Sequence, residues 1–311
     1  MKNICELLDI KYPIIQGAMA NISKAELVAA VSSAGGLGVI GSSNNNKEWV
    51  RNEIRKVKEL TDKPFGVNIL LLSPHANDIA ELVIEEKVKC VTTGAGNPGP
   101  YIEKWKEAGI IVIPVVPSVA LAKRMEKAGA DAVIAEGMEA GGHIGRMTTF
   151  ALVPQVSDAL NIPVIAAGGI ADRKGALAAF ALGAKGIQAG TVFLATKECP
   201  IHENYKNIVV NAKDTDTVIT GSDQAPVRVI KNQMAVEYIR LNKEGASFEE
   251  LEKLTLGSLS KAIYDGNLNE GSFMAGQISG LVREIKTVKE VIDEFVIGFT
   301  TYKESLEILW K

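Results

Sequence analysis

The stretch IPVIAAGGIAD, Ile162–Asp172, decides how the chain folds. Its first part, Ile162–Ala166, is wholly apolar, as is typical of a strand buried on both faces of a parallel sheet. Gly168 and Gly169 follow, and the next residues, Asp172–Leu182, have the pattern of an amphipathic helix. A strand, a glycine turn and a helix in this order predict one βα unit.

The same order recurs over the first two thirds of the chain. Apolar runs rich in Val and Ile start at intervals of roughly 21 to 31 residues, the length of a parallel βαβ repeat. The eight predicted strands are Pro13–Gly17, Gly36–Ile40, Phe65–Leu70, Val88–Thr93, Ile110–Val116, Asp131–Ala135, Ile162–Ala166 and Gly186–Gly190. Amphipathic stretches between them include Lys47–Leu60, Asn77–Glu86 and Ser118–Ala128. Eight units favour an α/β fold, a closed (β/α)8 TIM barrel, although an open doubly wound sheet has the same strand order in sequence.

The repeat stops after Gly190. Helix-like stretches at Ala225–Glu244 and Ser247–Tyr264 predict a small, mostly helical cap over 201–280. The tail, Val288–Trp310, has the pattern of one or two helices that return to the barrel. The predicted division is therefore a barrel domain of 1–200, completed by 281–311, and a cap on the substrate side.

Composition excludes several classes of protein. The 311 residues are 47% hydrophobic and carry a formal net charge of -3, with no basic arm, so a nucleic-acid partner is not expected. Cys5, Cys90 and Cys199 are far apart and predict free thiols without a zinc site. No uncharged run has the length of a membrane span and no apolar core follows Met1, which predicts a cytoplasmic protein that does not bind membranes.

Two neighbouring strand ends carry the groups that bind a phosphate. In a barrel of this kind the chemistry lies at the C-terminal ends of the strands, and the last two strands commonly hold a phosphate. Gly168 and Gly169 free backbone N–H groups ahead of a helix N-terminus, and Gly190 and Thr191 add N–H donors and a hydroxyl. These residues predict a phosphate-bearing ligand.

A histidine lies in a glycine-rich loop after the sixth strand. The loop reads EGMEAGGHIG, Glu136–Gly145, and His143 is one of only three histidines in the chain, beside His75 and His202. An imidazole titrates near neutral pH, which suits it to proton transfer at an active site. The alternative is a flexible loop with an exposed histidine.

One motif suggests a dinucleotide site and is rejected. Gly94–Gly99, GAGNPG, fits G-x-G-x-x-G after a strand and before a helix. The fingerprint also needs an acidic residue about 20 positions on, at the end of the next strand, and Pro114–Ser118 contains none. We expect these glycines to let the backbone approach a flat ligand at the barrel mouth.

Taken together, these motifs resemble those of the FMN-dependent enoyl-acyl-carrier-protein reductase II family, which is itself similar to the nitronate monooxygenases. The resemblance covers nearly the whole chain and is weakest between about Cys199 and Gly221. The matching segments are Tyr12–Met19, Lys63–Asn68, Thr92–Pro98, Ile111–Met125, Ala135–Gly145, Pro163–Ala171 and Met274–Gln277.

The resemblance implies a barrel that holds one FMN, whose phosphate binds at Gly168, Gly169, Gly190 and Thr191. It also implies that further residues line the flavin ring and ribityl chain. These are Gln16, Gly17, Ala18, Met19, Asn68, Glu136, Gly141, Gly142, Gln188, Met274, Ala275, Gly276 and Gln277. His143 would be the catalytic histidine. No metal site is expected among protein ligands, although dependence on a monovalent cation is known in the family.

The implied reaction belongs to fatty acid synthesis and lipid metabolism. NADH or NADPH reduces the flavin, the β-carbon of an enoyl thioester on acyl carrier protein receives the hydride, and His143 protonates the α-carbon or stabilises the enolate. The family expectation is a homodimer, and Arg228, Lys231 and Arg240 would meet the acidic carrier unless they are ordinary surface charges. Two alternatives are a nitronate monooxygenase, with His143 as base, and a flavin-binding barrel without catalysis.

Overall fold

The computed structural model describes residues 3–222 and 225–297. Eight parallel strands form its main sheet, in the spatial order β1-β9-β8-β6-β5-β4-β3-β2. They are β1 (Ile14–Gln16), β2 (Gly38–Gly41), β3 (Phe65–Leu70), β4 (Cys90–Gly94), β5 (Ile111–Val116), β6 (Val133–Glu136), β8 (Val164–Ala167) and β9 (Gly186–Ala189). Each predicted strand is present, with ends that differ by a few residues.

The sheet closes into a barrel between its first two strands. Ile15 forms a parallel bridge with Leu37, and the N–H of Leu37 donates to the carbonyl of Ile14 at 2.9 Å. The fully buried side chain of Gln16 spans the same seam, where its Oε1 accepts from the N–H of Val39 at 3.1 Å. The predicted (β/α)8 barrel is therefore confirmed, and the open doubly wound sheet is excluded.

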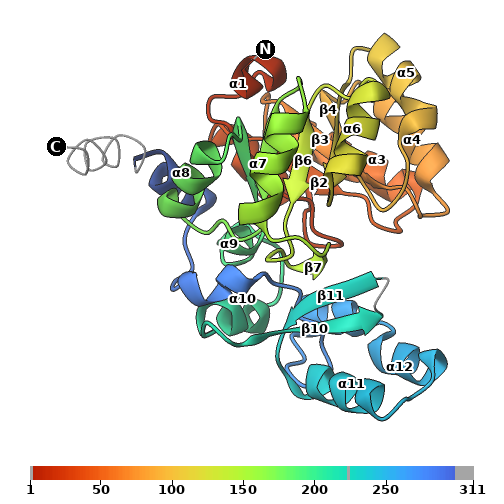
Figure 1. Ribbon diagram of the computed structural model, residues 1–311, viewed down its shortest axis with the longest axis vertical. Coiled ribbons are helices and arrows are strands. Elements are labelled where there is room, and N and C mark those ends of the chain that lie inside the picture. The colour runs from red at the N-terminus through yellow and green to blue at the C-terminus, as the bar shows by residue number, and fades with distance from the viewer. Residues whose placement is uncertain (1–2, 223–224, 298–311) are drawn as a thin grey trace.

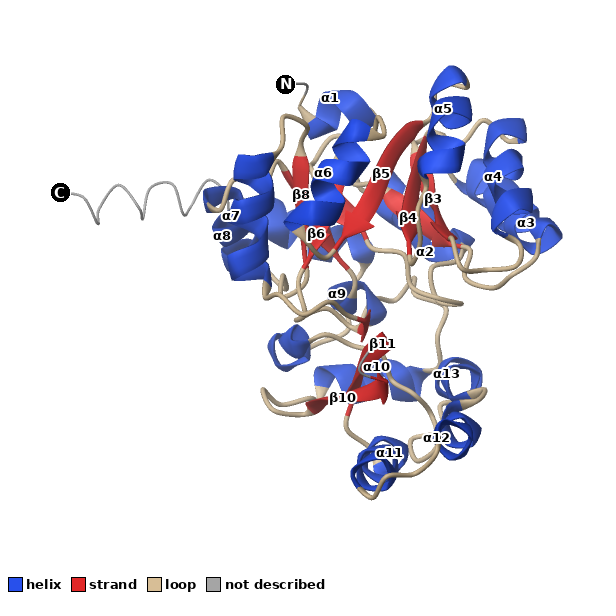
Figure 2. Ribbon diagram, turned by 45° about the vertical axis from the view of Figure 1, so that its right-hand side comes forward, coloured by secondary structure: helices blue, strands red, loops and turns tan. Residues whose placement is uncertain are grey.

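Helices follow the strands and cover the outside of the barrel (Figures 1 and 2). Those of the barrel are α1 (Ile4–Leu8), α2 (Ala25–Ser33), α3 (Lys47–Leu60), α4 (Ala76–Glu85), α5 (Gly99–Glu107), α6 (Val119–Lys127), α7 (Thr149–Ala159), α8 (Arg173–Ala181) and α9 (Thr191–Leu194). Asparagine and serine begin two of them, since Asn46 accepts from the N–H of Trp49 and Ser118 accepts from the N–H of Leu121.

Alternate residues of the strands face the inside of the barrel. Ile113, Ile134 and Ile165 belong to one buried cluster, which also contains Ile4 and Leu8 of α1. All five side chains are inaccessible to solvent. The N-terminal helix thus packs onto the interior residues of the barrel, which leaves the opposite end for ligands.

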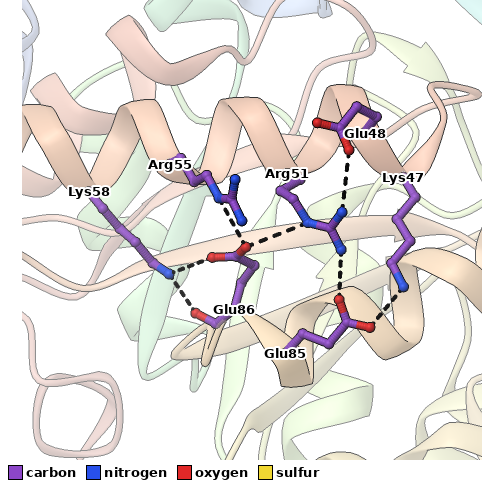
Figure 3. Close-up of polar contacts among 7 residues, drawn as sticks. All are labelled: Lys47, Glu48, Arg51, Arg55, Lys58, Glu85 and Glu86. Carbon is purple, nitrogen blue, oxygen red and sulfur yellow. Dashed lines mark hydrogen bonds and ion pairs between the residues drawn. The ribbon is translucent and has the colours of Figure 1, made fainter.

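An ion-pair network joins α3 to α4 on the barrel flank (Figure 3). Its members are Lys47, Glu48, Arg51, Arg55, Lys58, Glu85 and Glu86. Glu86 accepts from Lys58 at 2.9 Å and from Arg55 at 3.3 Å, and its side chain is 13% exposed. The hydrogen bond from Lys47 lowers the pKa of Glu85. Each of the seven charges of this network has an opposite charge beside it.

The cap contains a β-hairpin as well as helices. β10 (Thr217–Ser222) and β11 (Ala225–Ile230) pair antiparallel, and β7 (Gly142–His143), from the loop after β6, adds a third strand beside β11. The helical elements are α10 (Glu203–Val210), α11 (Gln233–Lys243), α12 (Phe248–Thr255), α13 (Ser258–Ser260), the π-helix η1 (Lys261–Asp265) and the 3-10 helix η2 (Gln277–Leu281). Figure 1 shows β7 between the barrel and the hairpin.

The predicted helix Ala225–Glu244 is wrong in its first part. Residues Ala225–Ile230 form β11, because Val227, Val229 and Ile230 are β-branched and pair with β10 and β7. The helix starts only after Asn232, whose side chain accepts from the N–H of Ala235.

The tail is helical over 288–297, as predicted for the start of the returning segment. The rest of that prediction, 298–311, lies outside the described residues. Among residues 3–222 and 225–297, no helix has both the length and the apolar character to span a membrane.

Candidate active site

The two glycines after β8 have conformations that favour glycine. Gly168 and Gly169 have φ values of +90° and +73°. A Cβ atom on Gly168 would lie 2.8 Å from the carbonyl oxygen of Gly137, so no side chain fits there. Neither N–H donates a hydrogen bond to any described residue. Two adjacent donors without a partner in the described chain suit an anion at the barrel mouth.

The N-terminus of α8 contributes less than the sequence suggested. The carboxylate of Asp172 caps this helix and accepts from the N–H groups of Lys174 and Gly175 at 2.9 and 3.0 Å. These donors are already satisfied, and the cap brings a negative charge. A phosphate at this edge therefore depends on the glycine N–H groups rather than on the first turn of α8.

The end of β9 is tied to the loop that returns from the cap. Thr191 is 8% exposed, and its Oγ1 accepts from the N–H of Gly276 at 2.9 Å. The N–H of Gln277 in turn donates to the carbonyl of Glu139 at 2.9 Å. Gly190 precedes α9, and its N–H has no partner within the part of the chain that is described. The structure thus brings Gly190, Thr191 and 274–277 together.

The loop after β6 packs closely on that same segment. A Cβ on Gly141 would lie 2.7 Å from the backbone of Ala275, and one on Gly142 would lie 3.6 Å from Sδ of Met274. Glu139 fixes the start of α7, since its carboxylate accepts from the N–H of Thr149 at 2.9 Å and from its hydroxyl at 3.0 Å. Predicted residues from two distant parts of the sequence therefore form one wall of the mouth.

His143 lies on a strand, not in a flexible loop. It pairs with Val227 of β11, while Gly142 pairs with Arg228. Side chains alternate along a strand, so His143 and Val227 face the same side of the small sheet. His143 is exposed, and its imidazole makes no hydrogen bond with the residues that the structure describes. The hairpin thus fixes the backbone of the predicted catalytic residue and leaves its ring free.

Glu136 ends β6 at the bottom of the mouth. Its carboxylate accepts no hydrogen bond from a described residue, and burial raises its pKa to about 7. At neutral pH the group is therefore divided between its neutral and ionised forms. A carboxyl of this kind can donate a hydrogen bond as well as accept one, which suits a polar ligand that contacts the floor of the mouth.

The remaining predicted residues lie at the ends of β1, β3 and β9. Gln16 is fully buried and donates to Ser23 Oγ at 2.8 Å, so its side chain serves the barrel wall. A Cβ on Gly17 would lie 3.2 Å from the side chain of Gln188, which is 8% exposed. Asn68 donates to Thr92 Oγ1 at 2.9 Å. Ala18 and Met19 continue from Gly17 and are half-buried.

A cavity of about 560 Å³ opens between the barrel and the cap. Val227 and Met274 line it, so it adjoins the face of the small sheet on which His143 lies. Asn21, Asn44 and Asn45 lie on its barrel side, and α11 and α12 contribute Tyr238, Phe248 and Leu251 on its cap side.

The three basic residues that were predicted to meet the carrier protein differ in their surroundings. Arg228 is only 3% exposed, and it donates to the carbonyl of Met138 at 3.1 Å and to Thr217 Oγ1 at 3.2 Å. A side chain this buried cannot contact a carrier protein, so the prediction for Arg228 is wrong. Arg240 is held by Glu237 and Glu244 at 2.7 and 2.6 Å, whereas Lys231 is exposed.

The residues present fit the phosphate end of a flavin mononucleotide. Gly168, Gly169 and Gly190 offer N–H groups without partners in the described chain. At the end of β2, a separate part of the mouth, the hydroxyl of Ser42 is buried without a partner. Unpaired buried polar atoms are rare unless a ligand uses them. Within the residues described, no three His, Cys, Asp or Glu side chains gather as metal ligands.

The mouth of this (β/α)8 barrel combines glycine N–H groups and a histidine ring that have no partner in the described chain, an arrangement that suits an anionic ligand beside a group able to transfer a proton. A family model described as nitronate monooxygenase matches residues 2–298. The chain therefore belongs to the nitronate monooxygenase family of flavin-dependent oxidoreductases.

Known relatives carry several names. FabK from Thermotoga maritima is 49% identical, with a TM-score of 0.95 over 99% of each chain. A (3aS,4S,5R,7aS)-5-hydroxy-7a-methyl-1-oxo-octahydro-1H-indene-4-carboxyl-CoA dehydrogenase of Mycobacterium tuberculosis is 32% identical over 98% of each chain. A probable nitronate monooxygenase of Staphylococcus saprophyticus is 36% identical over 90% of this chain and 92% of its own length. The resemblance seen in the sequence is confirmed at the level of the family.

Proposed function

We propose that this protein is an FMN-dependent enoyl-thioester reductase of the enoyl-acyl-carrier-protein reductase II type. The observation that carries the proposal is the position of His143. Its backbone is fixed by pairing with Val227, its ring is free, and it faces the side of the small sheet that the cavity adjoins. The 49% identity to FabK, an enoyl-acyl-carrier-protein reductase II, supports the same assignment.

The chain would hold the cofactor through groups that have no other partner. Gly168, Gly169 and Gly190 would donate to the phosphate of FMN. When bound, FMN supplies hydride transfer from NADH or NADPH to the β-carbon of a trans-2-enoyl thioester. Glu136 would contact the polar edge of the ring, and the 139–142 and 274–277 loops would exclude water from one wall.

The proton is the part of the reaction that the chain itself supplies. Reduction of the double bond needs one hydride at the β-carbon and one proton at the α-carbon. His143 would hold that proton on its imidazole and release it to the α-carbon. Solvent would then restore the proton through the exposed side of the ring.

Isotope labelling tests the proposal. The protein is given crotonyl-CoA with NADH or NADPH in D2O, and the product is analysed by mass spectrometry and NMR. We expect saturated butyryl-CoA with a solvent deuterium at the α-carbon. Nucleotide oxidation without a saturated product would overturn the assignment.

The family description favours a second candidate, a nitronate monooxygenase. In that reaction His143 would remove a proton from a nitroalkane, and oxygen would be consumed. A cavity of about 560 Å³ is larger than a short nitroalkane needs, which is why the reductase is preferred. Oxygen uptake with nitroethane, in the absence of any enoyl reduction, would reverse this preference.

A further inference from the structure

The cavity between the barrel and the cap has a mixed cap side and a polar barrel side. On the cap side, Leu251, Val227 and Met274 are apolar and Tyr238 is aromatic, and polar side chains that include Thr220, Glu252, Thr255 and Ser258 lie among them. Asn21, Ser43, Asn44 and Asn45 make the barrel side polar. A plain hydrocarbon chain would pack on the apolar side chains and leave the amides of the barrel side without hydrogen bonds, at a cost in binding. The cavity therefore suits a ligand that is itself part apolar and part amide.

On the barrel wall, the linked amides of Asn21 and Asn45 present one free donor and one free acceptor, beside the polar side chains of Ser43 and Asn44. Asn45 Nδ2 donates to Asn21 Oδ1 at 3.1 Å, which joins the two amides. This leaves Asn21 Nδ2 and Asn45 Oδ1 with no partner among the described residues. A secondary amide has the complementary pair, because its carbonyl accepts and its N–H donates.

The backbone of this wall is held in an unusual conformation. Asn21 and Ser43 have φ values of +59° and +50°, a region that residues other than glycine rarely adopt. Such conformations cluster at ligand sites, where the surrounding structure maintains them. Here the link between Asn45 and Asn21 joins the loop after β2 to the loop after β1.

We propose that this cavity binds the pantetheine arm of the substrate, with Asn21 and Asn45 pairing with one of its two amides. The inference rests on the proposed reduction of thioesters and adds where the carrier arm lies. Pantetheine consists of short alkyl segments separated by amides, which matches the apolar side chains and the amides of the cavity. Coenzyme A and acyl carrier protein share this arm, so one site accounts for both sources of thioester.

A substrate series with matched variants tests the assignment. Asn45→Leu removes the free acceptor, and Asn52→Leu, on the exposed face of α3, is the control. Each protein is given the crotonyl group as its S-ethyl, pantetheine, coenzyme A and carrier-protein thioester. We expect Asn45→Leu to raise KM by about fivefold or more for the three pantetheine-containing substrates, with kcat within about twofold. With the S-ethyl thioester the two variants should have equal KM.

Binding of S-methylpantetheine, measured by calorimetry on the FMN-loaded protein, separates this inference from the proposed reaction. If no thioester is reduced, the proposed function fails, while a Kd raised about fivefold by Asn45→Leu would still support the site. Equal effects of Asn45→Leu on all four thioesters would overturn the inference.

Two further outcomes would also overturn it by assigning the cavity another occupant. One is a rise in KM caused by Asn45→Leu that grows as the acyl chain lengthens from four to ten carbons, while S-methylpantetheine binding does not change. The cavity would then hold the acyl chain. The other is an effect confined to the carrier-protein thioester, which would place the contact on the carrier itself.

Discussion

The α3–α4 flank and the mouth of the barrel treat polar groups in opposite ways. On the flank, the carboxylates of Glu85 and Glu86 each meet basic side chains from the neighbouring helix (Figure 3). At the mouth, Glu136, His143 and the N–H of Gly168 have no partner within the described chain. The flank uses its charges to join two helices, whereas the mouth keeps its donors and acceptors free for ligands.

The largest effect should come from removing the free imidazole. His143→Ala should lower kcat for enoyl reduction by about 10²- to 10⁴-fold, because the proton donor to the α-carbon is lost. Reduction of the bound flavin by NADH or NADPH should change by less than about threefold, as no proton from His143 is used there. Stopped-flow measurement of the two half-reactions separates these effects. His75→Ala is the control, and equal slowing of both half-reactions would remove His143 from its assigned role.

The second effect concerns the anion-binding glycines. Gly168→Ala should weaken FMN binding by about tenfold or more, since the new Cβ would push on the carbonyl of Gly137 and displace the N–H donors. Gly109 also has a positive φ, of +74°, but no atom lies within 4 Å of its Cβ position. Gly109→Ala should therefore lower stability and leave the Kd for FMN unchanged. Fluorescence titration of the apoprotein with FMN measures the Kd of both variants. Equal weakening of FMN binding by the two substitutions would contradict the assignment of Gly168 to the phosphate site.

The third effect depends on pH and on Glu136. Burial raises its pKa from 4.5 to about 7, so the folded protein holds this proton more tightly than the unfolded chain does. Its contribution to stability is therefore complete below about pH 4.5 and is lost as the pH rises towards 7. Glu136→Gln should raise the free energy of unfolding by about 2 kcal/mol at pH 8 relative to wild type, with a much smaller change at pH 4.5. Urea denaturation at both pH values checks this, and a pH-independent difference would contradict the raised pKa of this half-buried carboxyl.

The smallest effect should come from the flank. Glu86→Gln removes the charge that Arg55 and Lys58 share, and it should lower the free energy of unfolding by about 1 kcal/mol or less. Enoyl reduction and FMN affinity should not change, because the network lies outside the mouth. Thermal unfolding at low and high salt measures the stability, and a loss of activity at unchanged stability would show that the two regions are coupled.

The sequence was most informative where the pattern is local. Regular apolar runs predicted all eight strands, because both faces of each strand are buried in this fold. The amphipathic pattern predicted α3 with its observed bounds. The turn after β8 was also predicted, because the adjacent glycines Gly168 and Gly169 mark a conformation that only glycine adopts without strain.

Contacts between distant segments were beyond the sequence patterns. Ala225–Ile230 contains apolar residues that suit a helix or a strand, and its pairing with β10 and with β7 makes it a strand. Arg228 looked like a surface charge and is buried against Met138. The hydrogen bond between Asn45 and Asn21 joins two separate loops, so no local sequence pattern predicts it.

An anaerobic two-step titration tests the central claim most directly. NADH or NADPH is added to the FMN-loaded protein until the visible absorbance of the flavin is lost, and crotonyl-pantetheine is then added in the absence of oxygen. We predict that the yellow colour returns in proportion to the thioester added, with butyryl-pantetheine as product. Loss of colour with no recovery on adding the enoyl thioester, followed by recovery with oxygen alone, would contradict the account and favour oxidation of nitronates.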